Sequence, residues 1–275
     1  MGVTHIDIGA RTATPSTKHL NSTGTAVNRA PTTFLDQIFD AHGGTGAWQA
    51  ASAIHARVEA GGLLPATRMP GSRFKDYHLT IELDEQRATM DPFPEPGLKA
   101  IFDRGRVRIE RTSGEVVARR DDPRAAFFGL SGVRRNVRCD ALDAAYFVGY
   151  AMWNYLATPL LFTHPGVEVS DGGPWIDHGE QWRRLEVIFG GDLVTHSRAQ
   201  TFYYDARGLL RRHDYVADII GPHARVAHYC AEHAMFGGLV FPTRRRVLPM
   251  AIGNSPMHFP ILISIDLHEL RVEHR

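Results

Sequence analysis

The sequence predicts an α+β protein built on a large antiparallel β-sheet, and three observations lead to this fold class. Short segments with β-branched residues or period-two alternation recur in both halves of the chain, and clusters of Gly, Pro or Asp separate them. A single long apolar segment, 144–162, lies between the two runs of strands. The strands are long and follow one another, so we expect the helices to lie on one side of the sheet.

The N-terminal part is expected to hold a leader and two short helices. Residues 1–31 are rich in Thr, Ser, Ala, Asn and Gly and lack the apolar stretch of an export signal, so we expect a disordered leader before a single domain over 32–275. Thr32 or Thr33 can cap a helix that begins at Phe34 and ends at His42-Gly43-Gly44. A second helix is expected around Trp48, over 46–53.

Two runs of strands follow from the pattern of β-branched and alternating residues. The first run is expected over 54–62, 77–84, 87–91, 99–103 and 106–111. The second run is expected over 182–189, 195–205, 208–218, 224–235, 241–248 and 261–272.

The apolar segment between the runs predicts a buried helix over 141–157 and not a membrane span. Gly149, Asn154 and Pro159 interrupt it, and the acids Asp140 and Asp143 stand at its start. We expect the helix to end before Pro159, because the residue before a proline avoids helical geometry. One edge carries polar groups at i, i+4 spacing, and this edge faces either solvent and strand ends or a cavity: Tyr146, Tyr150, Asn154 and Thr158.

Composition limits the possible functions. The chain has 31 basic and 30 acidic residues, a net charge of +1, which predicts no nucleic-acid partner. Its two cysteines, Cys139 and Cys230, are too few for a disulfide framework, and with the missing export signal they predict a cytoplasmic protein. None of the glycine pairs has the strand–glycine–helix context of a phosphate loop, so no nucleotide cofactor is expected.

The order of the elements and several motifs resemble the LolA-like family of lipoprotein-sorting half-barrels, over about Thr33 to Val272. The motifs are Ala41-His42-Gly43-Gly44 with Trp48, Trp182-Arg183-Arg184-Leu185, Gln200 to Asp205, Gly208 to Tyr215 and Phe241 to Arg245. The resemblance implies a strongly curved antiparallel half-barrel with helices plugging its open, concave side around an apolar cavity. Members of this family carry acyl chains, and one, an enzyme of the violacein pathway, rearranges an aromatic intermediate without a cofactor. This sequence differs from the carrier members in lacking an export signal.

The predicted hairpin around Asp205 carries most of the candidate catalytic and ligand-binding residues. With a two-residue loop, Asp205 faces Gly208, Gln200 faces His213 and Arg198 faces Tyr215. A three-residue loop would shift this pairing. The opposite face of the hairpin, with Tyr203, Arg212 and Asp214 among others, is expected to meet solvent.

From this register we expect one face to gather a catalytic set and a binding set. His213 and His196 are candidates for a general acid or base, Arg198 for an anion or carbonyl clamp, and Tyr215 for an orienting donor. The residues expected to contact a ligand are Gln200, Phe202, Tyr204, Tyr150 and Asn154. The alternative is an ordinary hydrogen-bonded strand surface.

Two other groups of residues have compositions found in metal sites or hydrolase triads. His228, Cys230 and Glu232 share one face of a strand, but no metal-binding motif accompanies them, so no metal site is expected. A second set, Ser264, Asp266 and His268, alternates along the last strand without a nucleophile elbow, which argues against a hydrolase triad.

The sequence therefore leaves two functional hypotheses. The first is a cofactor-independent enzyme that acts by acid–base chemistry on a hydrophobic or aromatic small molecule, in a cyclisation, isomerisation or rearrangement. The second is a non-catalytic carrier or sensor of a lipid or acyl chain. In both, the partner is a hydrophobic small molecule, and no obligate protein partner is expected.

Overall fold

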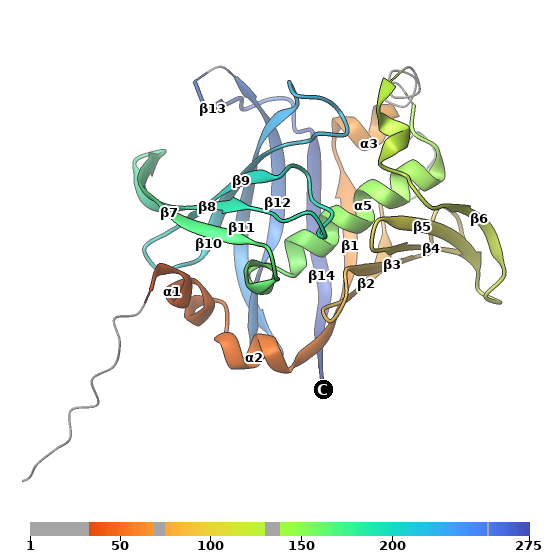
Figure 1. The fold of residues 1–275 in the computed structure, drawn as a ribbon, viewed down its shortest axis with the longest axis horizontal. Helices are drawn as coiled ribbons and strands as arrows, with labels where there is room; N and C mark the ends of the chain where they lie inside the picture. The colour runs from red at the N-terminus through yellow and green to blue at the C-terminus, as the bar shows by residue number, and fades with distance from the viewer. Residues whose placement is uncertain (1–32, 69–74, 130–137, 252) are drawn as a thin grey trace, which may run out of the picture. The chain divides into compact units, whose positions relative to one another are not determined.

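A single 14-stranded antiparallel sheet dominates the computed structural model, which describes residues 33–68, 75–129, 138–251 and 253–275 (Figure 1). The large antiparallel sheet with few helices confirms the predicted α+β class. Thr33–Arg275 form one compact unit. The leader expected over 1–31 lies outside the described residues.

The strands run in the order β6-β5-β4-β3-β2-β1-β14-β12-β11-β10-β9-β8-β7, and β13 pairs with β12. The N-terminal arm comprises β1 (Ala51–Gly61), β2 (Tyr77–Glu82), β3 (Arg87–Asp91), β4 (Leu98–Asp103), β5 (Arg106–Arg111) and β6 (Val116–Arg120). The C-terminal arm comprises β7 (Glu168–Asp177), β8 (Glu180–Ile188), β9 (Ala199–Tyr204), β10 (Leu210–Val216), β11 (Arg225–Phe236), β12 (Leu239–Ala251), β13 (Ser255–Pro256) and β14 (Ile263–His274).

Each arm is a meander, and the two meet where β1 pairs with β14, with Ile54 opposite Val272. The edge strands β6 and β7 and the two-residue β13 were not predicted. β7 contains Gly172, Gly173 and Pro174, which normally weaken a strand. An edge strand tolerates them, and a register shift between Asp171 and Gly173 accommodates Gly172 as a bulge.

The helices are short except for one. They are α1 (Phe34–Ala41), α2 (Thr45–Ala50), α3 (Leu63–Arg68), which was not predicted, and α5 (Ala141–Leu156), with 3-10 turns η1 (Ala125–Phe127) and η2 (Leu160–Thr163). Thr33 caps α1 as expected, because its Oγ1 accepts a hydrogen bond from the Asp36 backbone N–H at 3.1 Å. Asp140 caps α5 in the same way, with a 2.8 Å bond from the Asp143 backbone N–H.

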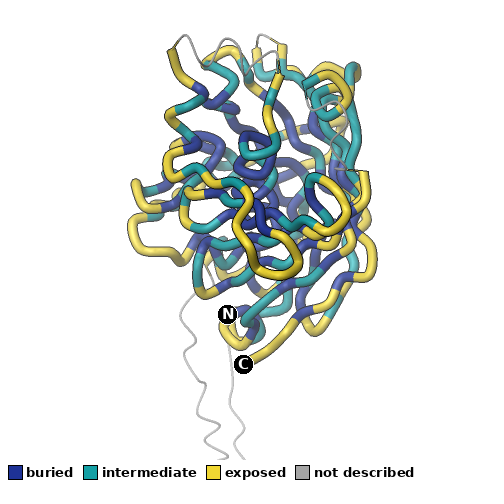
Figure 2. Tube along the Cα trace, turned by 90° about the vertical axis from the view of Figure 1, so that its right-hand side faces the viewer, coloured by how far each residue is buried: buried dark blue, intermediate teal, exposed yellow. Residues whose placement is uncertain are grey.

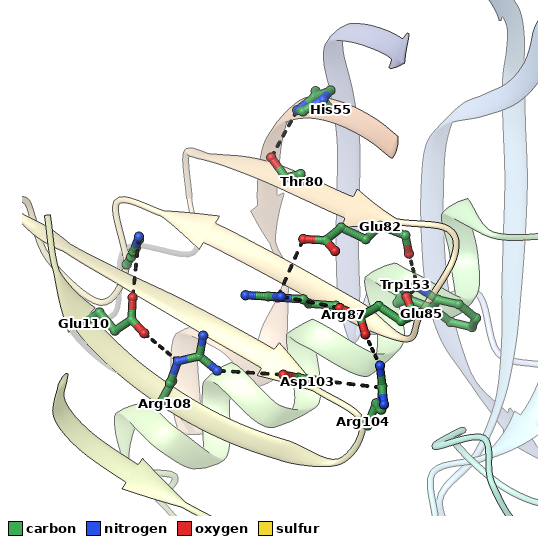
Figure 3. Close-up of polar contacts among 11 residues, drawn as sticks. His55, Thr80, Glu82, Glu85, Arg87, Asp103, Arg104, Arg108, Glu110 and Trp153 are labelled. Carbon is green, nitrogen blue, oxygen red and sulfur yellow. Dashed lines mark hydrogen bonds and ion pairs between the residues drawn. The ribbon is translucent and has the colours of Figure 1, made fainter. Parts of the chain in front are cut away.

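Helix α5 is the central element of the core and lies between the two arms in Figure 1. Gly149 allows a close approach to β4, because a Cβ at this position would stand 2.3 Å from the Cβ of Phe102. The Trp153 indole N–H donates to the backbone oxygen of Glu82 at 2.7 Å, at the end of β2 (Figure 3). Figure 2 shows that buried residues gather in the middle of the unit, and most residues of α5 are among the buried ones. Among the described residues, no helix combines the length and apolar composition that crossing a membrane requires.

Candidate functional site

The β9–β10 hairpin has a different register from the one predicted. His213 lies opposite Phe202 instead of Gln200, and a register shift at Arg211 separates it from the pair Leu210 and Tyr204. The loop is longer than two residues because the Asp205 carboxylate accepts the backbone N–H groups of Arg207 and Leu209, at 2.9 and 3.0 Å. Beyond the register shift, the observed pairing is displaced by two positions from the predicted one. A displacement of two leaves each side chain on its original face, because side chains alternate with a period of two.

His196 is the centre of a buried aromatic cluster beneath α5. Its Nδ1 lies 3.2 Å from the Tyr150 hydroxyl, and its Nε2 lies 2.8 Å from the Tyr155 hydroxyl. The Tyr155 hydroxyl is also 2.8 Å from that of Tyr215, whose ring stacks on His196 with centroids 3.9 Å apart. A neutral imidazole donates through one ring nitrogen and accepts through the other, so both nitrogens of His196 are satisfied.

His213 forms the second half of this cluster. Its ring stacks on Phe202 at 4.0 Å, and its Nε2 lies 2.6 Å from Oε1 of Gln200. Because an amide oxygen only accepts, the His213 Nε2 carries the proton. The Gln200 amide N–H in turn donates to the backbone oxygen of Ser197 at 2.7 Å. His196, His213, Tyr215, Gln200 and Phe202 are therefore brought together, as the sequence predicted.

The predicted site residues Arg198 and Tyr204 lie in different environments. Arg198 does not join the cluster as expected, because it is exposed while His196, two residues earlier, is fully buried. Strand β9 begins only at Ala199, so Arg198 does not follow the alternation that was extended to it. Tyr204 is buried, and its hydroxyl has no hydrogen-bond partner.

The polar edge of α5 faces the protein interior instead of solvent. Tyr146, Tyr150, Asn154 and Thr158 are all buried. Tyr150 contacts His196, and the Asn154 amide N–H donates to the backbone oxygen of Val194 at 3.2 Å. This edge therefore packs on the loop that leads into β9.

Three residues of the cluster were not anticipated in this role: Tyr155, His228 and Arg245. Tyr155 connects the cluster to α5. The centroid of the His228 ring lies 4.5 Å from that of the Tyr155 ring, and neither ring nitrogen of His228 has a hydrogen-bond partner. Arg245 is 1% exposed; it donates to the Tyr155 backbone oxygen at 3.1 Å and to Cys230 Sγ at 3.4 Å. The Arg245 guanidinium thus donates a hydrogen bond to a backbone carbonyl near the C-terminus of α5, where the helix dipole favours positive charge. Tyr155 lies outside the i, i+4 edge formed by Tyr146, Tyr150 and Asn154, so that spacing did not single it out.

Burial keeps the imidazoles of the cluster neutral. It lowers the pKa of His196 to about 3, with a smaller contribution from the charge of Arg124. Burial also lowers the pKa of His213 and of His228 well below the ordinary value, and the Arg245 charge adds to both effects. The pKa of Tyr155 is raised, again chiefly by burial. A general acid or base works best with a pKa near the working pH, and burial moves the pKa of these imidazoles away from it.

The opposite face of the hairpin was expected to meet solvent, and this expectation is wrong for Tyr203, Arg212 and Asp214, which are buried, although Ala199 is exposed. Arg212 is fully buried and donates to both carboxylate oxygens of Asp214, at 2.7 and 2.8 Å. The Tyr203 hydroxyl donates to the same carboxylate at 2.9 Å. The ring of Trp175, from β7, packs on Tyr203 at 5.6 Å, and Asp177 lies 3.6 Å from Arg212. The unpredicted strand β7 therefore supplies groups that bury this face.

A small apolar pocket adjoins the cluster at Tyr155; we call it the α5 pocket. Its volume is about 50 Å³. The floor is formed by the buried residues Tyr77, Ala151, Met152, Tyr155 and Ile265. The rim is formed by the half-buried residues Ala60, Leu64, Pro65, Phe147, Val148 and Ile263. The rim contains only apolar side chains, so an apolar surface leads from solvent toward Tyr155.

A polar groove of about 280 Å³ also adjoins the cluster. Gln200 and Tyr215 line it together with Tyr203 and Asp214. The groove includes residues of both strands beyond the pair Thr201 and Asp214, where the β9–β10 pairing ends. The cluster is thus flanked by an apolar cavity and a polar one.

The other two groups of residues have the following surroundings. In the described part of the chain, no three His, Cys, Asp or Glu side chains are grouped so as to hold a metal ion. Asp266 pairs with Arg246 at 2.9 Å, and His268 lies 3.6 Å from Glu59, so these residues have partners outside the row they form on β14.

No family model and no curated protein matches this sequence. Among solved structures, the chain is similar to a LolA superfamily protein from Nitrosomonas europaea, with 9% identity over 90% of this chain and 96% of that one and a TM-score of 0.48. It is also similar to a DUF1329 family protein from Desulfovibrio piger (13% identity, 87% and 92% covered, TM-score 0.45). A putative outer membrane lipoprotein-sorting protein domain from Vibrio parahaemolyticus gives 9% identity, 87% and 91% coverage and a TM-score of 0.47. This likeness concerns the fold alone, and no function is drawn from it.

Proposed function

We propose that this protein binds a small apolar molecule in the α5 pocket. The observation that carries the proposal is the lining of the pocket, in which apolar and aromatic side chains form both the buried floor and the half-buried rim. Transfer of an apolar group from water to such a lining is favourable by about 25 cal/mol per Å². The protein then acts as a carrier or sensor, since a binding role needs no titrating group.

The size of the pocket indicates the shape of the ligand. A volume of about 50 Å³ is several times the roughly 10–15 Å³ that one water occupies on this measure. It is far below the roughly 300–1,000 Å³ of pockets for drug-sized ligands. The end of one unbranched alkyl chain fits this space better than a fused ring system does.

We further propose that the sheet curves around α5 as a half-barrel, which would enclose the ligand. Gly149 approaches Phe102 of β4, while Tyr155, six residues later on α5, contacts His213 of β10. Strands β4 and β10 are seven positions apart in the sheet, roughly 34 Å in a flat arrangement. Six helical residues span only about 9 Å, which supports a bend of the sheet toward the helix.

A chain-length series tests the binding proposal. Calorimetric titration with 1-hexanol to 1-dodecanol is expected to give an affinity that rises about fourfold per methylene, then levels off when the pocket is full, because each buried CH₂ contributes about 0.8 kcal/mol. Ala60→Phe places a ring at the rim and should abolish binding. Ala53→Phe is the matched control, because Ala53 is half-buried on the same strand and does not line the pocket.

Two outcomes would overturn the proposal. One is the absence of saturable binding for every alcohol, together with a ligand-free mass of the freshly purified protein in native mass spectrometry. The other is equal loss of binding in Ala60→Phe and Ala53→Phe, which would place the ligand elsewhere.

The second candidate is the cofactor-independent acid–base enzyme, akin to the violacein-pathway enzyme that the sequence motifs suggested. One observation favours it: Tyr155, Gln200 and Tyr215 belong to the His cluster and also line a cavity. In this case His213 or His196 would exchange protons with a bound ligand. Deuterium exchange at the α-carbon of 1-indanone, followed by NMR, is a suitable probe. Exchange that exceeds background and is lost in His213→Gln supports an enzyme, and background exchange in the unmodified protein refutes it for this substrate type.

A further inference from the structure

Three large apolar side chains are exposed on α3 and on the segment bonded to it, and we call them the α3 patch. They are Leu63 at 43%, Phe259 at 79% and Ile261 at 39% exposure. They belong to two segments held together by backbone hydrogen bonds: Leu63 N–H donates to the oxygen of Ile261, and Leu64 N–H to that of Leu262, both at 3.0 Å. The patch is therefore one surface formed by α3 and the segment that precedes β14.

The α3 patch is continuous with the mouth of the α5 pocket. Leu64 and Pro65, directly after Leu63 in α3, belong to the rim of the pocket. Ile263, two residues after Ile261, belongs to the rim as well. An apolar molecule entering the pocket would therefore pass along this patch.

Three basic residues have backbone positions near α3. The Lys75 backbone oxygen accepts the Ala60 N–H at 3.3 Å, and the Arg68 backbone oxygen accepts the Cys139 N–H at 2.9 Å, which places Lys75, Arg68 and Arg138 near α3. Lys75 and Arg138 are exposed, and none of the three forms an ion pair with a described carboxylate. The nearby acid Asp76 is already bound by Arg57 at 2.7 Å.

We propose that the α3 patch docks on the surface of an anionic lipid membrane. Apolar side chains that insert among lipid chains, flanked by cations that face anionic head groups, are the features that drive interfacial binding. Phe259 is too exposed to belong to a preformed groove, which favours a fluid apolar phase over a shaped protein partner. Docking would place the pocket mouth against the phase in which an apolar ligand is dissolved.

Vesicle co-sedimentation tests this proposal. The protein is expected to bind vesicles of phosphatidylcholine with 30 mol% phosphatidylglycerol, and to bind pure phosphatidylcholine more weakly. The double variant Phe259→Ser/Ile261→Ser should lower the partition coefficient at least tenfold on both vesicles. Lys75→Gln should lower it about fivefold on the anionic vesicles only, with the effect shrinking as salt is raised.

The matched control is Met235→Ser, because this side chain is 67% exposed on β11. This variant should bind vesicles like the unmodified protein. Absence of vesicle binding, or an equal loss in the control, overturns the proposal. So does a change of oligomeric state in the double variant, measured by sedimentation velocity, without a change in vesicle binding, because the patch would then join two copies.

The proposal does not depend on the ligand-binding function. Ala60→Phe fills the α5 pocket and leaves the exposed side chains of the patch in place, so it should sediment with anionic vesicles like the unmodified protein. Failure of alcohol binding with intact vesicle binding would refute the function and leave the docking surface. The reverse result would refute the docking surface alone.

Discussion

The two arms of the sheet contact the same helix through different chemistry. In the N-terminal arm Phe102 packs against Gly149, and the polar contacts with α5 include the Trp153 indole N–H with Glu82 and Arg120 with Asp143. The charged residues of β3, β4 and β5 are half-buried or exposed, apart from Glu110. Figure 3 shows these groups as a chain of ion pairs that includes Arg104 with Glu85 and Arg108 with Glu110. In the C-terminal arm polar groups are buried on both faces. A polar group costs little at the surface, whereas a buried one must be paired, so the C-terminal arm is where single changes should matter most.

The largest expected difference between the arms is in their arginines. Arg212→Ala should lower the free energy of unfolding by about 3–5 kcal/mol, because it leaves the buried Asp214 carboxylate without its cation. Arg104→Ala should lower it by less than about 1 kcal/mol, because the Arg104 side chain is 68% exposed. Urea unfolding of both variants measures the difference. Equal losses would refute the contrast between the arms.

The second expected effect is a loss of stability in acid that comes from His196. Its pKa is about 3 in the folded protein, against roughly 6.5 in an unfolded chain. The neutral form is favoured by folding, so its contribution is complete above about pH 6.5 and is lost as the pH falls toward 3. At pH 5 the loss amounts to about 2 kcal/mol.

His196→Gln isolates this effect. The difference in unfolding free energy between pH 7.5 and pH 5 should shrink by about 2 kcal/mol in the variant, as measured by urea unfolding at both values. An unchanged difference would mean that His196 takes up a proton as readily in the folded protein as in the unfolded chain.

The smallest expected effect is the difference in stability between two Tyr→Phe variants, one on α5 where it contacts the C-terminal arm and one on β9 of that arm. Tyr155→Phe removes a hydroxyl that bonds both His196 and Tyr215, and should cost about 1.5 kcal/mol. Tyr204→Phe removes a buried hydroxyl without a partner, and should be neutral or slightly stabilising. Thermal unfolding distinguishes them. If Tyr204→Phe were the more damaging change, its hydroxyl would have a partner in solution.

Local sequence patterns predicted much of the fold and part of the site. Alternation and turn residues located most strands, and Pro159 placed the C-terminal end of α5 within a residue. Strands β6 and β7 were missed because an exposed edge strand needs no buried face, and because Gly172, Gly173 and Pro174 indicate a loop. His213, Tyr215 and Gln200 were placed together despite the wrong register, because a shift of two residues preserves the face.

By itself, then, the sequence determined the antiparallel class, the buried central helix and the inward face of the hairpin, because these depend on the periodicity of neighbouring residues. Tertiary structure alone decided that Arg198 is exposed, that Arg212 and Asp214 are buried, and that Tyr155 and Arg245 meet. These outcomes depend on contacts between segments far apart in the chain. Whether a polar side chain is covered is set by the element that packs on it, and no local pattern records that element.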